Sequence, residues 1–194
     1  MKKNEIIKDN LYPWGGDFTT GNYQNNVALI ALNINYIPHY DIAIYGKLKT
    51  ENIGIEKIIA NVISNPFIRF IIICGGDIRG HRSGTSLICL HKNGIDDNNR
   101  IIDAPGAIPY IENINKKAIT RFQQQIEIID LIDVVDEEVI NESIKKLIDN
   151  KTESFGEPFI AIQMVKESKQ SIDDTRALHS KIKINYLGKI EKRK

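Results

Sequence analysis

The chain has 194 residues, enough for one domain of ordinary size with an appendage and too few for two large independent domains. Its 26 Lys and Arg nearly balance its 25 Asp and Glu, so the formal net charge of +1 argues against a nucleic acid or an anionic membrane as partner. No apolar run approaches the roughly 20 residues of a membrane-spanning helix, so we expect no bilayer span.

The cysteine content favours a reduced compartment. Cys74 and Cys89 stand outside any CxxC pair, each within an apolar stretch, and no secretory signal pattern precedes them. We therefore expect two buried thiols and a cytoplasmic location.

Short apolar runs and one helical pattern follow each other in the first third of the chain. Residues 12–17 are rich in turn formers and predict a loop, whereas the apolar runs at 27–32 and 42–45 predict short strands. Residues 33–41, between these strands, resist assignment. Over residues 52–65 isoleucine and valine recur at helical spacing, which predicts an amphipathic helix.

A strand, a glycine-rich loop and a helix come next. Residues 68–74 predict a buried strand, and residues 75–84 form a polar loop with four glycines. A shorter helix then carries Leu87 and Leu90, and Gly94 stands where a C-terminal cap is expected.

The following region predicts one more strand and two surface helices. Residues 100–102 are a strand candidate that ends at a second break, residues 103–106. Asn115 caps one helix, and Asp136 opens another that has two acidic residues in its first turn. The first of these helices takes its apolar face from four residues: Ile119, Phe122, Ile126 and Ile129.

Strands that alternate with helices at these spacings indicate parallel crossover connections. We therefore expect an α/β, Rossmann-like fold over residues 1–150, with an open, mostly parallel sheet and helices on both faces. Beyond residue 150 the chain is more polar. We expect residues 151–194 to form a small C-terminal appendage of one or two strands and a polar linker.

Ligands of open α/β sheets bind outside the carboxyl ends of the strands, which points to the loops 75–84 and 103–113. Of the four histidines, His81 alone lies in these loops, so it is the best single candidate for a functional side chain. The alternative is a polar histidine that is merely exposed to solvent. The first loop matches neither GxGxxG nor GxxxxGK[ST], so phosphate binding has little support beyond the backbone amides of residues 83–86.

A metal role for His81 depends on how the metal is held. A lone imidazole cannot form a tight transition-metal site, whereas a metal within a macrocycle requires only one axial ligand from the protein. A ligating imidazole commonly donates its other N–H to a carboxylate, and Asp77 in the same loop is the candidate for that partner. The alternative is that Asp77 is an exposed loop acid.

Four stretches within residues 12–150 carry a further signal: 46–57, 63–75, 80–86 and 106–113. The third contains a Gly-His-x-x-Gly motif at Gly80 to Gly84. Together the four stretches resemble the A subunit of tetrahydromethanopterin S-methyltransferase, the corrinoid-binding component of a methyl-transfer complex of methanogenesis.

The resemblance implies a Rossmann-type domain that binds cobalamin, with His81 as the lower axial ligand of cobalt and the one catalytic residue. It implies methyl transfer through cobalt(I) from a tetrahydromethanopterin-type donor to a thiol such as coenzyme M. The partners would be methyl-donor and methyl-acceptor enzymes or subunits, with a homo-oligomer as a further option. Placement and resemblance together predict the cofactor-binding residues: Gly80, His81, Ser83, Gly84, Thr85, Ser86, Gly106, Ala107, Ile108 and Pro109.

Two departures from the family pattern have consequences. Thr85 precedes Ser86 where the family usually has Gln, so a contact made by the glutamine amide would be shortened or bridged by water. The chain ends in the polar residues 151–194, where members of the membrane complex have a transmembrane helix. We therefore expect a soluble homologue without sodium transport.

Two other functions stay open at the level of sequence. One is cobalamin storage, delivery or sensing without turnover. The other is a nucleotide-binding Rossmann domain, in which the glycine-rich loop meets a phosphate and His81 is incidental.

Overall fold

A five-stranded sheet organises the first of the two units into which the chain divides, residues 1–163 and residues 164–194. The computed structural model describes four stretches of the chain: residues 11–162, 176–179, 182–185 and 190–192.

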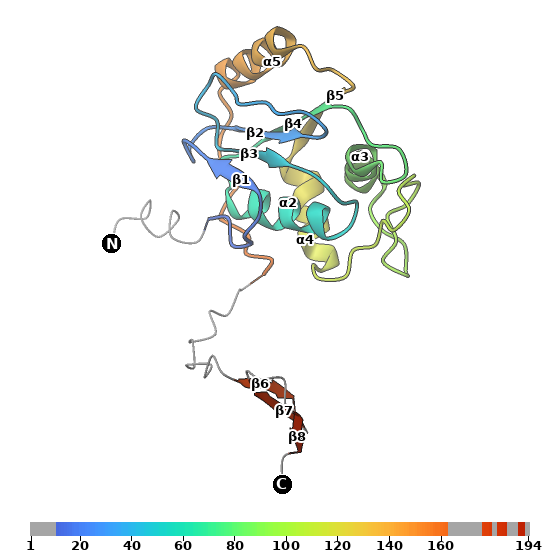
Figure 1. The fold of residues 1–194 in the computed structure, drawn as a ribbon. Coiled ribbons are helices and arrows are strands. Elements are labelled where there is room, and N and C mark those ends of the chain that lie inside the picture. The colour runs from blue at the N-terminus through green and yellow to red at the C-terminus, as the bar shows by residue number, and fades with distance from the viewer. Residues whose placement is uncertain (1–10, 163–175, 180–181, 186–189, 193–194) are drawn as a thin grey trace, which may run out of the picture. The chain divides into compact units, whose positions relative to one another are not determined.

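The strand order in the sheet of the first unit is β1-β3-β2-β4-β5 (Figure 1). The strands are β1 (Phe18–Thr20), β2 (Val27–Ala31), β3 (Ile44–Lys47), β4 (Phe70–Gly75) and β5 (Glu127–Ile132). Strands β3, β2, β4 and β5 run parallel, and β1 is antiparallel to β3 at one side of the sheet. The parallel strands therefore end at one common edge, called the carboxyl edge below.

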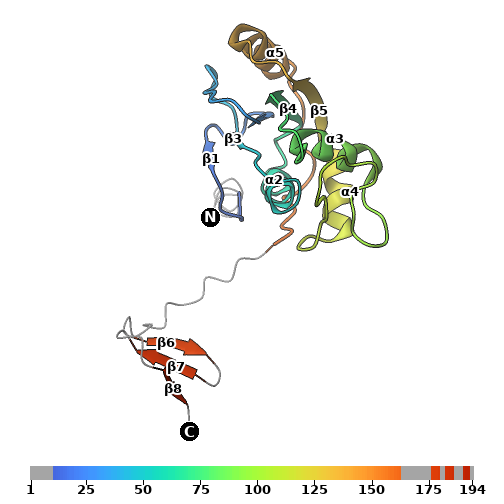
Figure 2. The ribbon, with the colours of Figure 1, turned by 45° about the vertical axis from the view of Figure 1, so that its right-hand side comes forward.

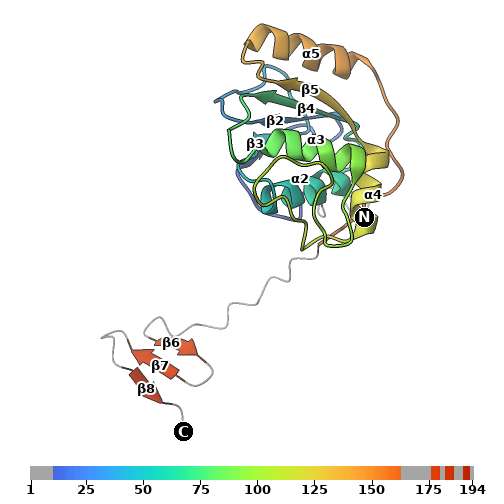
Figure 3. The same ribbon diagram turned by 90° about the vertical axis from the view of Figure 1, so that its right-hand side faces the viewer.

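Helices cover both faces of this sheet: α2 (Ile53–Ser64), α3 (Ser83–Asn93), α4 (Lys116–Gln125) and α5 (Glu137–Asp149). Figures 2 and 3 show α2, α3 and α4 on one face and α5 on the other. In β4, Ile71 and Ile73 belong to the core cluster on the α2 side, whereas Ile72 and Cys74 belong to the cluster on the α5 side. This period of two is typical of a strand buried on both faces. The predicted α/β fold, with an open, mostly parallel sheet, is confirmed.

None of the helices in the described part of the chain combines the length and the apolar character that a membrane crossing requires.

Both predicted helix caps are confirmed. Asn115 Oδ1 accepts a hydrogen bond from Ala118 N at 3.0 Å at the start of α4. Asp136 Oδ1 accepts one from Glu138 N at 2.9 Å at the start of α5. Each cap satisfies a first-turn N–H group that has no partner within the helix.

Two expectations about the middle of the chain are wrong. The helix that begins after Asn115 was expected to include Ile129, but α4 ends at Gln125 and Ile129 lies in β5. Ile129 continues the apolar spacing of α4 by chance, although it belongs to a half-buried strand at the sheet edge. Residues 100–102 form only isolated bridges, between Ile95 and Ile101 and between Arg100 and Tyr110.

The segment after α5, residues 151–162, packs against other parts of the first unit. Phe155 N donates to Pro66 O at 2.8 Å. The guanidinium groups of Arg69 and Arg121 lie 5.2 and 4.6 Å from the centre of the Phe155 ring, within the range of cation–π attraction. Residues 151–162, which were expected to belong to the appendage, thus lie with the first unit.

The described residues of the second unit form three antiparallel strands in the order β6-β7-β8: β6 (Arg176–His179), β7 (Ile182–Asn185) and β8 (Ile190–Lys192). One or two strands were expected here. The polar stretch was expected at residues 166–180, of which residues 176–179 form β6 and the others lie outside the described residues.

Candidate functional site

His81 lies in the connection from β4 to α3, at the carboxyl edge of the sheet. The backbone N–H groups of His81 and Arg82 both donate to Ile78 O, at 3.2 and 2.9 Å, which closes a single tight turn. Gly80 has a φ of 93° within this turn, a conformation that glycine adopts without strain. The turn presents the imidazole at the protein surface, where the His81 side chain is 58% exposed.

A buried carboxylate from another loop holds this imidazole. Glu51 follows β3, and its Oε2 lies 3.1 Å from His81 Nδ1. The Glu51 side chain is only 4% exposed, and its Oε1 accepts a hydrogen bond from Ile108 N at 3.0 Å. One carboxylate thus joins three connections: the loop after β3, the loop after β4, and the loop 103–113.

Glu51 determines which nitrogen of His81 carries a proton. Burial raises the pKa of Glu51, but hydrogen bonds from its own backbone amide, from Ile108 and from His81 outweigh burial and hold that pKa below its ordinary value. Glu51 is therefore ionised at neutral pH and can only accept hydrogen bonds, which makes His81 Nδ1 the donor. Nε2 of the neutral ring then keeps a lone pair and is the nitrogen available to a ligand.

The expectation that Asp77 supports His81 is wrong. Asp77 Oδ1 accepts from Gly84 N at 3.1 Å, and Oδ2 accepts from the backbone N–H and the hydroxyl of Thr85 at 2.8 and 2.7 Å. These amides belong to the first turn of α3, and Arg82 at the N-cap position makes no side-chain bond to them. First-turn amides lack helical partners. The acid nearest to His81 in sequence, Asp77, therefore caps helix α3 and does not support the imidazole.

The loop 103–113 approaches the His81 turn closely at Gly106. A Cβ at Gly106 would lie 2.6 Å from His81 O, 2.8 Å from Glu51 Cγ and 3.0 Å from Ser86 Oγ. Only glycine fits this position without a shift of the backbone. Ser86 Oγ is buried at the same point and, within the described residues, has no hydrogen-bond partner.

A second buried glutamate, Glu56 of α2, holds the far end of the same loop. Its Oε1 accepts from Glu112 N at 2.5 Å and from Asn113 N at 2.6 Å, and its Oε2 accepts from Asn113 Nδ2 at 2.6 Å. Glu56 is 1% exposed. The loop 103–113 is therefore attached at two points to buried carboxylates at the start of α2.

The predicted cofactor-binding residues fall into groups that the structure separates. Those gathered around the Glu51–His81 contact are Gly80, His81, Ser86, Gly106 and Ile108. Gly84 instead packs on the sheet, because a Cβ there would lie 2.7 Å from Leu32 Cδ1. The hydroxyl of Thr85 is committed to Asp77. The remaining three are Ala107, which is exposed, and Ser83 and Pro109, which are buried.

Two exposed apolar residues belong to the loops that meet at His81. Ile78, whose carbonyl closes the His81 turn, is 50% exposed, and Ile108, whose amide bonds to Glu51, is 59% exposed. Large apolar side chains left open around a polar group are typical of a ligand-binding or interaction surface. The loops that meet at His81 thus present one exposed imidazole together with exposed apolar residues.

No three His, Cys, Asp or Glu side chains in the described residues are grouped closely enough to hold a metal ion.

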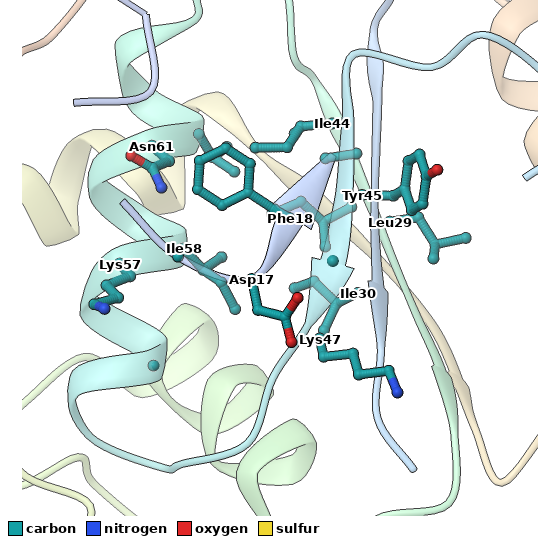
Figure 4. Close-up of a pocket in the computed structure, with 16 residues that line it drawn as sticks. Asp17, Phe18, Leu29, Ile30, Ile44, Tyr45, Lys47, Lys57, Ile58 and Asn61 are labelled. Carbon is teal, nitrogen blue, oxygen red and sulfur yellow. The ribbon is translucent and has the colours of Figure 1, made fainter. Parts of the chain in front are cut away.

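An apolar cavity elsewhere in the first unit does not include His81. The cavity, of about 90 Å³, opens between α2 and the strands β1, β3 and β2, and its apolar lining includes Phe18, Ile30, Ile44, Ile58 and Val62 (Figure 4). Two of its polar lining residues have partners, since Asp17 pairs with Lys49 at 2.9 Å and Asn61 bonds to the backbone of Trp14. Tyr45, Lys47 and Lys57 also line the cavity, so its lining combines apolar and polar residues.

Comparison with known proteins identifies the family. A family model described as the A subunit of tetrahydromethanopterin S-methyltransferase matches residues 5–172. The chain belongs to this family. Over 153 residues it is 44% identical to the A subunit of the Mtx methyltransferase of Methanosarcina barkeri, an alignment that covers 78% of this chain and 77% of that protein.

Two further relatives are longer than this chain. Over 153 residues it is 47% identical to the A 1 subunit of tetrahydromethanopterin S-methyltransferase of Methanothermobacter thermautotrophicus, covering 77% of this chain and 64% of that protein. Over 151 residues it is 41% identical to the A subunit of tetrahydromethanopterin S-methyltransferase of Methanosarcina barkeri, covering 75% of this chain and 62% of that protein. The alignments thus span less than two thirds of these two relatives.

In this family member, sequence reasoning missed the two glutamates that shape the site. Glu51 and Glu56 both lie within residues 46–57, one of the stretches that carry the family resemblance. Glu56 shares a helical face with the buried Ala60, so a charge on a buried face was an available signal. Glu51 offered no such signal, because its partner His81 comes from the loop of a different strand.

Proposed function

We propose that this chain is a cobalamin-binding methyl carrier, with His81 Nε2 as the lower axial ligand of cobalt. The observation that carries the proposal is the 3.1 Å contact between Glu51 Oε2 and His81 Nδ1. This contact makes Nδ1 the donor and leaves Nε2 free on an exposed ring, the arrangement that a metal-ligating histidine requires. Membership of a family named for a methyltransferase component supports the same assignment.

The residues around His81 fit a macrocycle that brings its own metal. Such a group requires one axial ligand from the protein, which His81 provides. Ile78 and Ile108, which belong to the two loops that meet at His81, offer exposed apolar surface. Buried hydroxyls nearly always have a partner, so Ser86 Oγ, which has none among the residues that the structure describes, is suited to a polar substituent of the bound group.

When bound, the corrinoid would supply a cobalt centre that accepts a methyl group from a tetrahydromethanopterin-type donor and passes it to a thiol such as coenzyme M. The residues of the chain would bind the corrinoid and orient it. Glu51 keeps the proton on His81 Nδ1 and fixes the direction of the ring. The turn at Ile78 holds His81 at the surface, within reach of methyl-donor and methyl-acceptor enzymes or subunits, which we propose as partners in the cytoplasm.

A nucleotide site in this loop is disfavoured by one observation. The backbone amides of Gly84 and Thr85, where a phosphate would bind at the start of α3, already bond to the Asp77 carboxylate. A second negative charge at this helix end would be repelled by Asp77. Cobalamin storage, delivery or sensing without turnover would use the same residues as the carrier and differs only in the fate of the methyl group.

Absorption spectra of the protein mixed with cobalamin test the axial ligand. Wild-type protein should bind one equivalent and show a histidine-ligated spectrum, and His81→Ala should lose that spectrum. His39→Ala is the matched control, because His39 is exposed on another connection, and its spectrum should equal that of the wild type. Identical spectra for His81→Ala and the wild type would remove His81 from the mechanism.

Methyl transfer separates a carrier from a storage protein. Methylated protein offered coenzyme M together with a cell extract should lose its methyl group to the thiol. Retention of the methyl group under these conditions would favour storage or delivery.

A further inference from the structure

We propose that Glu56 is a positioning residue, which sets the conformation of the loop 103–113 before the cofactor binds. The inference rests on the proposed function, because this loop forms one wall of that site through Gly106 and Ile108. Glu56 itself meets the loop at Glu112 and Asn113, away from the imidazole.

The surroundings of Glu56 show that its carboxylate is committed to the loop. A buried carboxylate is unfavourable unless it is well hydrogen-bonded. Glu56 is 1% exposed, and three donors from two neighbouring residues, Glu112 and Asn113, fill both of its oxygens. In the described part of the chain, every side-chain hydrogen bond of Glu56 goes to this loop. Hydrogen bonds to a charged acceptor are the strong ones, so the attachment is firm.

The Glu56 bonds matter because the loop has little regular structure of its own and, of its residues, only Ala104 and Ile111 pack in the core cluster. It contains no helix and joins no sheet, and the backbone bonds that hold it are few, such as Ile101 N to Pro109 O at 2.8 Å and Ile111 N to Asn99 O at 2.9 Å. Helix α2, in contrast, packs on the sheet through fully buried isoleucines on its other positions: Ile55, Ile59 and Ile63. Loss of the Glu56 bonds should therefore loosen the loop and leave the core in place.

The two buried glutamates should have separable effects. Glu51 contacts His81 directly and fixes its proton, whereas Glu56 acts on the ligand only through the loop. A change at Glu56 should weaken cofactor binding, while the complex that does form keeps its histidine-ligated spectrum. A change at Glu51 should alter the spectrum itself.

Amide hydrogen exchange of the cofactor-free protein is the first test. In Glu56→Gln, amides of residues 106–113 should exchange about tenfold faster, because the neutral amide accepts the loop donors more weakly. Amides of α4 should be unchanged. Glu112→Gln is the matched control, since it removes a carboxylate from the same loop and keeps the backbone N–H that bonds to Glu56. Unchanged exchange in the loop, or equally faster exchange in α2, α4 and the loop, would overturn the proposal.

Cobalamin titration is the second test. The dissociation constant of Glu56→Gln should rise about tenfold, with an unchanged spectrum at saturation. Asn113→Ala removes only the Nδ2 donor, so it should shift exchange and affinity in the same direction by less, and it serves if Glu56→Gln folds poorly. An unchanged dissociation constant in a variant whose loop exchanges faster would overturn the proposal. A wild-type protein that binds no cobalamin would refute the proposed function, and the exchange result would still decide the role of Glu56.

Discussion

Two acids at the carboxyl edge, Asp77 and Glu51, differ in what they support. Asp77 precedes His81 by four residues, yet its oxygens are used by the first turn of α3. Glu51 is 30 residues away along the chain, yet it holds the imidazole. The comparison teaches that backbone donors at a helix start take the acid nearest in sequence, so the support of the ring has to come from a separate loop.

Replacing Glu51 by Gln should have the largest effect on metal ligation. His81 Nδ1 would lose its charged acceptor, so the affinity of Nε2 for cobalt should fall about 10- to 100-fold. The fraction of bound cobalamin in the histidine-ligated form, read from its absorption spectrum, measures this. Asp77→Asn is the matched control and should leave that fraction unchanged. Equal losses in both variants would contradict the division of roles between the two acids.

Gly106→Ala should disturb the point where the two loops meet. The added methyl carbon would lie 2.6 Å from His81 O, so backbone must shift, and the free energy of unfolding should fall by about 1–3 kcal/mol. Chemical denaturation gives this value. Ala107→Ser, at the exposed neighbouring position, should stay within about 0.5 kcal/mol of the wild type. A Gly106→Ala protein of wild-type stability would show that the loops do not approach this closely.

Asp77→Ala should destabilise α3 without changing the axial ligand of the bound cobalt. Loss of the cap should lower the free energy of unfolding by about 0.5–2 kcal/mol, because first-turn amides lose their acceptor. Thermal or chemical unfolding measures the loss, and the spectrum of the bound cobalamin should be that of the wild type. A changed spectrum with unchanged stability would restore Asp77 as the partner of His81.

The smallest of the expected effects is the loss, at acidic pH, of the stability that Glu51 contributes. The pKa of Glu51 is lowered from its ordinary 4.5 in the folded protein, so its contribution to stability is present above that value and is lost as the pH falls through the lowered pKa. Below pH 4.5 the free energy of unfolding of the wild type should therefore fall with pH more steeply than that of Glu51→Gln. One proton corresponds to about 1.4 kcal/mol per pH unit at most. Parallel curves would mean that Glu51 keeps its ordinary pKa.

The parts of the fold that were predictable are those where local pattern and burial agree. Helix α2 follows from its isoleucine spacing, and the caps Asn115 and Asp136 follow from residue type alone. Strand β5 was missed because Ile126 and Ile129 continue the spacing of α4, and only the neighbouring strand β4 shows that Ile129 belongs to a sheet. Pattern alone could not supply that tertiary contact.

The candidate site also has parts that could be predicted from the sequence and parts that could not. The position of His81 in the connection after β4 was predictable, because it is a histidine in a glycine-rich loop after a strand. The role of Glu51 was not, because it depends on the sheet order that brings the ends of β3 and β4 to one edge with β2 between them. Ser86 was predicted to bind the cofactor, and the structure adds only that its hydroxyl is buried and has no partner in the described residues.

Electron paramagnetic resonance of bound cobalamin in the cobalt(II) state tests the axial ligand most directly. A single axial nitrogen-14 splits each cobalt line into three, and nitrogen-15 splits it into two. Protein labelled with nitrogen-15 only in histidine and loaded with unlabelled cobalamin should give the two-line splitting, and its His81→Ala variant should not. Three-line splitting in the labelled protein would place the tail base of the cofactor on the metal, and the absence of nitrogen splitting would place solvent there. Either result would contradict ligation by His81.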